Sequence, residues 1–313
     1  MRSVAARLAW AVVTFVAVAA LTSLTPRVLR PEYYPGQGVV SGVAHDLERV
    51  FLHFDLGRAW LWPGEPQISP MLKRSFAADL WLLAGAMFIG VGGGLAAGLW
   101  CASRRRSVAG RVLEASAMVL YCTPVFVVGL GLLLAFNPTF GALPLPVFFD
   151  AYPFWASPWH HPWDWFRNLL VPWLVLAAPL GAMVLRLTLA TAIETLDEDY
   201  VRTAYAKGVS SRNVIRRHVA PASYVTVASF VGVSIPLIVT NMVLVERVFG
   251  VQGFFVFTWR ALGHIQTDGP RTIDYPMIQA LTLWSAVLII FSSFILDMVL
   301  YRLDPRLRAA SAG

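Results

Sequence analysis

The sequence predicts an all-α polytopic membrane protein, and three observations carry that prediction. Hydrophobic residues make up 57% of the 313-residue chain, and charged residues make up only 14%. The mean hydropathy of +0.62 is high for a globular domain in water. Apolar residues also gather in runs long enough to cross about 30 Å of hydrocarbon. Because lipid offers no hydrogen-bond partners, we expect helices, which satisfy their own backbone groups.

Six apolar runs qualify as transmembrane helices within a single transmembrane domain of residues 1–313. The spans are 8–24, 76–100, 112–136, 169–192, 224–245 and 277–300. The loop 195–221 lies on one side, and the loops 26–75, 137–167 and 246–276 lie on the other. Small residues in "AVAAL" leave open a cleaved signal peptide in place of the first span. Four tryptophans of the second outer loop suit the membrane–water boundary: Trp155, Trp159, Trp163 and Trp165.

Lysine and arginine residues predict that both termini lie in the cytoplasm. They occur before the first span, between the second and third, between the fourth and fifth, and after the sixth, so all four groups fall on one side. The positive-inside rule assigns that side to the cytoplasm. The first outer loop also carries bases, but acids offset them. The cytoplasmic group comprises Arg2, Arg7, Arg104, Arg105, Arg106, Arg111, Arg202, Lys207, Arg212, Arg216, Arg217, Arg302, Arg306 and Arg308.

Motifs of catalysis and metal binding are missing from the sequence. A P-loop ends in Gly-Lys followed by Ser or Thr, but Lys73 is followed by arginine and Lys207 by glycine. "GVSIP" lacks the second glycine of a nucleophile elbow, and H-E-x-x-H does not occur. His160 and His161 are adjacent, which does not place two ligands on one helix face. We therefore expect no catalytic, cofactor or metal site, and we interpret "GVGGGLAAG" as a helix-packing segment.

Ionisable residues are rare deep within the predicted spans, which weakens an ion-coupled mechanism. Pro236 and Asn241 of the fifth span are candidates for a translocation path, although kinks and polar contacts are also common in helix packing. Five ionisable residues lie near span edges or cytoplasmic ends: Asp79, Glu114, Arg186, Glu246 and Asp297.

The segment "DEDYVRTAYAKGVSSRNVIRRHVAP", residues 197–221, is highly charged between two apolar spans. Its pattern predicts two short helices joined by a turn. Acids at its start suit the helix dipole, and Glu198 and Arg202 are spaced for an i,i+4 ion pair. Gly208 fits a helix C-cap, and Ser210 fits the N-cap of the second helix. Pro221 marks the passage into the fifth span.

Two interpretations of this loop are open on the residues alone. It can be a solvated loop that follows the positive-inside rule. It can also be a docking element whose apolar stripe of Val201, Ala204 and Tyr205 fits a groove in a soluble partner.

The motif "YVRTAYAKGVSSRNVIRRHVAP" resembles the cytoplasmic EAA loop of ABC importer permeases, most closely the branch that imports dipeptides, oligopeptides and nickel. Further similar segments follow in order along the chain: "DLG" at 55–57, "TPVFVVGL" after Cys122, "VERVFGVQG" from Val245 and "LDPRLR" near the C-terminus. The resemblance implies a type I importer permease in the bacterial plasma membrane, with a cytoplasmic coupling helix-turn-helix.

The resemblance also implies partners and site residues. The partners are a second, homologous permease, two cytoplasmic ATPase subunits that bind ATP and Mg, and an extracytoplasmic substrate-binding protein. Arg202 stands where many importers have glutamate, so no particular salt bridge to the ATPase is implied. "LTPRVLRPEYY" and "QGFF" replace two proline-glycine motifs of the family on the outer side. The ATPase-coupling residues are Tyr200, Val201, Arg202, Thr203, Ala204, Tyr205, Lys207, Gly208, Arg212 and His218.

Two other function classes stay open beside the permease. An ion-coupled secondary transporter would require Asp297 and Arg186, and a membrane scaffold would bind a partner without transport. The missing P-loop agrees with a permease that takes its energy from a separate ATPase. The net charge of +7 arises mostly from the cytoplasmic clusters and gives no case for nucleic-acid binding.

Overall fold

The computed structural model describes residues 4–36, 38–104, 107–136, 158–263 and 272–303. These residues form helices and turns, and their only β-type pairing is an isolated bridge between Arg58 and Gln67. The predicted all-α class is therefore confirmed. Several residues that entered the predictions lie outside the described residues: Arg2, Arg105, Arg106, Trp155, Arg306, Arg308 and most of "LDPRLR".

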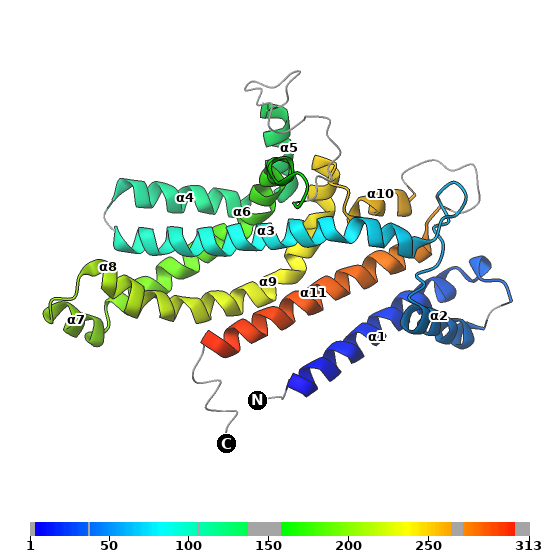
Figure 1. Ribbon diagram of the computed structural model, residues 1–313, viewed down its shortest axis with the longest axis horizontal. Coiled ribbons are helices and arrows are strands. Elements are labelled where there is room, and N and C mark those ends of the chain that lie inside the picture. The colour runs from blue at the N-terminus through cyan, green and yellow to red at the C-terminus, as the bar shows by residue number, and fades with distance from the viewer. Residues whose placement is uncertain (1–3, 37, 105–106, 137–157, 264–271, 304–313) are drawn as a thin grey trace. The chain divides into compact units, whose positions relative to one another are not determined.

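Two compact units make up the chain. One consists of Met1–Asp79 and Gln252–Ser292, and the other of Leu80–Val251 and Ser293–Gly313. The helices α3 and α11 each contribute to both units, as Figure 1 lets the reader follow along the chain. The prediction of a single transmembrane domain stays a prediction.

Within the described residues, five helices are long and apolar enough to cross a membrane, and they contain five of the six predicted spans. Each extends beyond the span predicted from hydropathy because polar residues continue the helix at its ends. The helices are α1 (Val4–Leu29), α3 (Ile68–Ser103), α6 (Pro162–Leu196), α9 (Ala220–Phe249) and α11 (Tyr275–Leu303).

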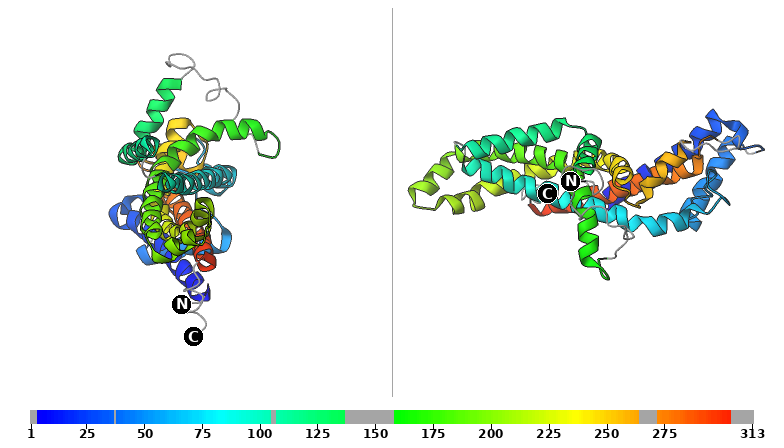
Figure 2. Two further views of the ribbon diagram at one scale, coloured as in Figure 1. Left: turned by 90° about the vertical axis from the view of Figure 1, so that its left-hand side faces the viewer. Right: turned by 90° about the horizontal axis from the view of Figure 1, so that it is seen from above.

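The third predicted span differs from the prediction because it is broken. α4 (Val108–Cys122) and α5 (Val125–Phe136) meet at an angle of 107°. Figure 1 shows α5 turning away from the direction of α4, and Figure 2 gives two further views. Thr123 adopts an extended conformation with φ −87° and ψ 127°. Pro124 explains the break, because proline lacks an N–H and disfavours helical geometry in the residue before it.

Glycines on one face of α3 allow a close approach to α6. Gly90, Gly94 and Gly98 are spaced four residues apart, so they lie on one side of the helix. A Cβ atom on Gly94 would lie 2.7 Å from the carbonyl oxygen of Gly181, and one on Gly98 would lie 2.7 Å from that of Leu185. This confirms the interpretation of "GVGGGLAAG" as a packing segment, although Gly92 and Gly93 face open space.

The unit of Met1–Asp79 and Gln252–Ser292 contains short helices in segments that the sequence predicts to be loops. They are η1 (Pro31–Tyr33), α2 (Val39–His53), η3 (Phe254–Phe257) and α10 (Thr258–Ala261). The segment "QGFF" is anchored by Asp79 of α3, whose carboxylate accepts hydrogen bonds from the N–H of Phe254 and the indole N–H of Trp284. The carboxylate of Asp274 likewise accepts hydrogen bonds from the N–H groups of Leu61 and Met277. Buried aspartates thus link distant segments of this unit.

Tryptophans gather at the start of α6. Trp159 and Trp163 are exposed, as an interfacial anchor requires, whereas Trp165 packs edge-on against Trp81 and Trp173 at ring-centroid distances of 5.3 and 5.2 Å. The indole N–H of Trp173 donates to the carbonyl of Trp81. Part of this cluster therefore fastens α6 to α3 instead of facing lipid.

Candidate docking site on the loop between α6 and α9

Two short helices connect α6 to α9, as predicted. α7 runs over Asp199–Ala206, and α8 (Ser211–Val214) begins after a turn at Gly208 (Figure 1). α9 begins at Ala220, next to Pro221, as the predicted passage into the fifth span requires, but the chain does not break there. α8 continues through a π-helical turn, η2 (Ile215–Val219), directly into α9, and the stretch Ser211–Phe249 is one apolar helix by length and composition. Pro221 therefore removes one backbone hydrogen bond from a continuous stretch, directly after the π-helical turn.

Gly208 ends α7 with a left-handed conformation at φ 80°. Its N–H donates to the carbonyl of Tyr205, and the N–H of Val209 donates to that of Ala204. These two bonds are the Schellman pattern, which satisfies the last carbonyls of a helix. The predicted C-cap is confirmed. Ser210 occupies the predicted N-cap position of α8, but its side chain makes no capping hydrogen bond.

An apolar inner face fixes the loop to the rest of its unit. Val201 is 0% exposed and Ala204 is buried beside it. They pack in one cluster with Val214 and Val219 of the second helix and with residues at the ends of α3 and α6: Cys101, Ala102, Leu189 and Ala192. Val201 and Ala204 therefore position the loop, and they are not available to contact a partner. The predicted stripe splits, because Tyr205 is exposed.

Four residues that support this loop were not predicted from the sequence: Cys101, Ala102, Leu189 and Ala192. All four fall in or beside apolar runs, where hydropathy alone does not separate residues that face lipid from residues that face protein. The small side chains of Cys101, Ala102 and Ala192 were the available signal, since small residues let helices approach closely.

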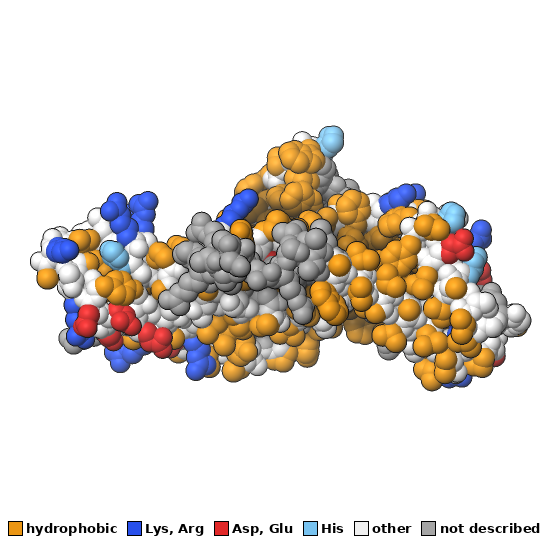
Figure 3. Space-filling model, turned by 90° about the horizontal axis from the view of Figure 1, so that it is seen from below, with side chains coloured by type: hydrophobic (Ala, Val, Ile, Leu, Met, Phe, Trp, Pro, Cys, Tyr) orange, Lys and Arg blue, Asp and Glu red, His pale blue; other side chains and the backbone are white. Residues whose placement is uncertain are grey.

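The outer face of the loop is charged and aromatic. Tyr200, Tyr205, Lys207 and Arg212 are exposed, as are Arg202 and Thr203. Arg202 pairs with Asp199 at 3.6 Å, not with the predicted Glu198. The ring of Tyr200 contacts the half-buried ring of His218 with a centroid distance of 6.2 Å, which joins α7 to the second helix. Figure 3 shows charged side chains gathered at the left-hand end, over α7 and α8.

A hollow of about 640 Å³ adjoins this face. Tyr205, Leu196 and Asp197 line this hollow, together with residues at the end of α3 and just before α4. The loop therefore presents an outer surface with a hollow beside it, and apolar packing of its inner face fixes it to α3 and α6.

The two path candidates lie on α9. Pro236 is exposed together with Val233, Leu237 and Thr240, which share one side of the helix, and Asn241 is half-buried at its edge. Arg186, named for the ion-coupled alternative, is exposed and donates to the sulfur of Met118 at 3.4 Å.

Replacing Val201 with alanine is expected to loosen α7. The lost methyl groups and the cavity they leave cost about 2 kcal/mol, which is roughly 30-fold in the equilibrium between seated and open loop. Trypsin should then cleave after Lys207 and Arg212 faster by up to this factor. Thr203→Ala is the control, because Thr203 is exposed on the same helix. Equal cleavage of both variants would show that the inner face does not hold the loop.

Comparison with known proteins places these features in a family. The model of the binding-protein-dependent transport system inner membrane component matches residues 94–309. The oligopeptide transport system permease protein OppB of Mycobacterium tuberculosis is 28% identical over 95% of this chain and 92% of its own length. DppB, a dipeptide transport system permease protein of Bacillus subtilis, is 28% identical over 85% of this chain and 78% of its own.

A third similar protein is the glutathione transport system permease protein GsiC of Escherichia coli, which is 29% identical over 85% of this chain and 81% of its own length. The family match covers Gly94 and Gly98 of α3, the broken span, the loop between α6 and α9, and the final helix. The chain belongs to the family of binding-protein-dependent transport system inner membrane components, the multi-pass permeases of ABC importers.

Proposed function

We propose that this chain imports peptides or a related small solute, and that it couples to ATPase subunits through the loop around Gly208. The observation that carries the proposal is the construction of that loop: an apolar inner face buried against α3 and α6, and an outer face of exposed tyrosines and bases. A surface held rigidly from behind can transmit a push from a soluble partner. The names of the similar oligopeptide, dipeptide and glutathione permeases support the substrate class.

The partners in this proposal are a second permease, two ATPase subunits and an extracytoplasmic binding protein. ATP and Mg would bind to the ATPase subunits, since this sequence has no P-loop. The exposed side of α9 with Pro236 would face the second permease or the path between the two chains. Asn241 would lie at the edge of that path.

The continuous helix from α8 into α9 gives the loop a mechanical role. Closure of the ATPase subunits would displace α7 and α8 together, because Val201 and Val214 share one cluster. The displacement would then pass along an unbroken helix into the membrane and shift the permease between two conformations. The differential contacts of the ATP-bound and nucleotide-free ATPase would drive this change.

Gly208→Val tests the coupling. Valine in the left-handed conformation costs about 1–2 kcal/mol, and the turn between α7 and α8 should distort. We expect peptide uptake by the reconstituted transporter to fall at least about tenfold while the ATPase subunits continue to hydrolyse ATP.

Gly64→Val is the matched control. Gly64 has φ 75° against 80° for Gly208, and a Cβ atom would meet nothing within 4 Å at either position. Both variants therefore carry similar local strain, but only Gly208 lies in the loop. Normal uptake by Gly208→Val at normal abundance would contradict the proposed coupling. Loss of uptake in both variants would do the same, because the effect would then be general strain.

A further inference from the structure

α2 carries an apolar flank that the described residues of the chain leave partly exposed. We define the apolar flank as Val40, Ala44, Leu47 and Phe51, whose spacing of four, three and four residues places them along one side of the helix. Val40 is 83% exposed and Phe51 is 43% exposed. A different side carries the exposed polar residues Ser41, His45 and Glu48. The helix is thus amphipathic, although it lies in a segment that hydropathy assigns to a loop.

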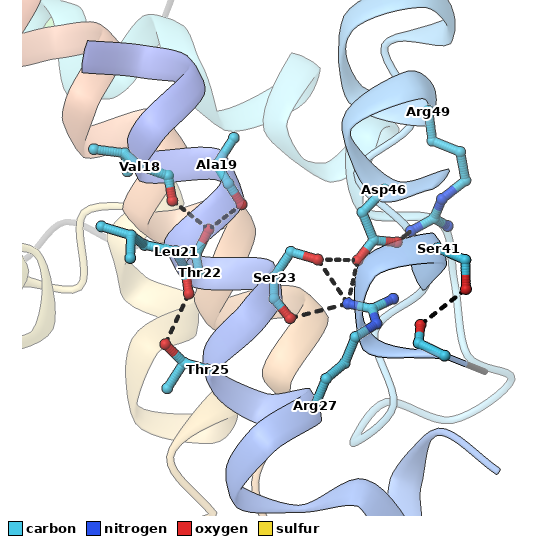
Figure 4. A network of polar contacts seen from close by, with 11 residues as sticks. Val18, Ala19, Leu21, Thr22, Ser23, Thr25, Arg27, Ser41, Asp46 and Arg49 are labelled. Atoms are coloured by element: carbon cyan, nitrogen blue, oxygen red, sulfur yellow. Dashed lines mark hydrogen bonds and ion pairs between the residues drawn. The ribbon is translucent and has the colours of Figure 1, made fainter. Parts of the chain in front are cut away.

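A buried polar network fixes α2 against α1, so the direction of the apolar flank is set. Arg27 of α1 pairs with Asp46 of α2 at 2.6 Å, and each residue is 5% exposed. Ser23 donates to the same carboxylate oxygen at 2.6 Å, while Arg49 pairs with the other oxygen at 2.7 Å (Figure 4). The helices also approach closely, because a Cβ atom on Gly42 would lie 2.4 Å from the Nε atom of Arg27.

One ring contact places the Phe51 end of the apolar flank at membrane depth. Phe51 meets Phe15 of α1 edge-on with a centroid distance of 5.6 Å. Phe15 lies within Ala9–Leu29, the part of α1 that qualifies as a membrane span. It lies eight residues from Ser23, on the side of Ser23 away from the end of the span, which is about 12 Å along a helix. A side chain that touches Phe15 therefore reaches into the hydrocarbon layer.

We propose that α2 dips into the leaflet that surrounds the end of α1, with the Phe51 end of its apolar flank embedded among the acyl chains. Amphipathic helices bury an apolar side at the membrane boundary in a similar way. α1 itself exposes Leu21, Leu24 and Val28 on the side away from Ser23 and Arg27. The part of Figure 3 where α1 and α2 lie nearest the viewer is mostly hydrophobic.

Lipid is favoured over a protein partner because Phe51 of the apolar flank contacts Phe15, a residue within a membrane span. The buried Arg27–Asp46 pair would then have a structural role. It fixes α2 against α1, so that one side of α2 faces lipid and another side faces water. The inference concerns the membrane alone and does not depend on the proposed coupling or substrate.

Cysteine labelling in open membrane fragments tests the embedding. Phe51→Cys and Glu48→Cys are introduced one at a time after Cys101 and Cys122, the two native thiols, have been replaced by alanine. Both positions are exposed in the folded chain, so only their surroundings differ. A thiol among acyl chains cannot ionise, and the thiolate is the reactive form. We expect a charged maleimide to label Phe51→Cys at least about tenfold more slowly than Glu48→Cys.

A second measurement separates lipid from protein as the cover. A small fluorophore is attached to Phe51→Cys in detergent, and the protein is reconstituted alone into vesicles whose lipids carry bromine on their acyl chains. Quenching of this fluorophore, with much weaker quenching at Glu48→Cys, supports the proposal. Equal labelling of both cysteines by the charged maleimide overturns it. Slow labelling of Phe51→Cys without quenching by brominated lipid also overturns it, because protein then covers the apolar flank.

Discussion

Asp46→Ala is expected to destabilise the packing of α2 on α1 by about 3–5 kcal/mol, the usual cost of leaving one partner of a buried ion pair without the other. Arg27 would remain 5% exposed beside Ser23 with no carboxylate. Arg49 would lose its shorter ion pair, which is 2.7 Å long, and would keep only the 3.8 Å contact with Asp55. The loss should appear as a lower midpoint of thermal unfolding of the purified protein in detergent.

A double replacement distinguishes the ion pair from simple loss of contacts. Arg27→Met with Asp46→Leu removes both charges and keeps apolar volume, and such replacements are often neutral or stabilising. Recovery of the unfolding midpoint in the double variant is therefore expected. If the double variant were as unstable as Asp46→Ala, the cost would not come from the uncompensated charge.

The pKa of Asp46 adds a dependence on pH. Burial raises this pKa, but hydrogen bonds from Arg27 and Ser23 and the charges of Arg27 and Arg49 lower it by more, so it lies below the ordinary value of 3.8. A lowered pKa means that the carboxylate contributes stability above pH 3.8, and that the contribution is lost as the pH falls through the folded-state value. Asp46→Ala should lack this acid-dependent part of the unfolding profile.

Gly94→Val is expected to force α3 and α6 apart at a cost of about 3 kcal/mol, the upper end of the usual range for overpacking. The new Cβ atom would lie 2.7 Å from the carbonyl oxygen of Gly181 and 2.7 Å from the Cβ atom of Val184. A backbone carbonyl cannot rotate away from the clash, so the helices must move. The measurements are the unfolding midpoint in detergent and the amount of folded protein in the membrane.

Gly92→Val controls for the helix propensity of valine. Gly92 lies on the same helix two residues away, and a Cβ atom there would meet nothing within 4 Å. We expect this variant to keep nearly normal stability. Equal losses in both variants would show that the glycines matter for the conformation of α3 and not for its contact with α6.

Hydropathy predicted the membrane helices well because every spanning helix must hide its backbone in lipid. The turn at Gly208 was also predictable, since a left-handed C-cap is a local requirement written in one residue. The division of the loop into a buried face and an exposed face was not predictable. Val201 and Tyr205 are both apolar enough to lie on either face. Their roles depend on Cys101 and Leu189, which are distant in sequence.

α2 escaped prediction for a related reason. Its apolar residues are too few for a span, and Arg27 and Asp46 look like ordinary loop charges until the structure joins them. The path candidates Pro236 and Asn241 and the ATPase-coupling residues remain predictions, because they depend on chains that a single sequence does not contain.

The break at Thr123–Pro124 bears on the number of times the chain passes through the bilayer. If α4 and α5 turned back to the side where α4 starts, the chain would make an odd number of crossings, and the two termini would lie in different compartments. The bases of the loop between α6 and α9 would then lie opposite those that follow α3. The positive-inside rule opposes this division. We therefore expect the bent pair to make one complete passage, which would place the loop at Gly208 on the side where the proposed ATPase subunits would bind.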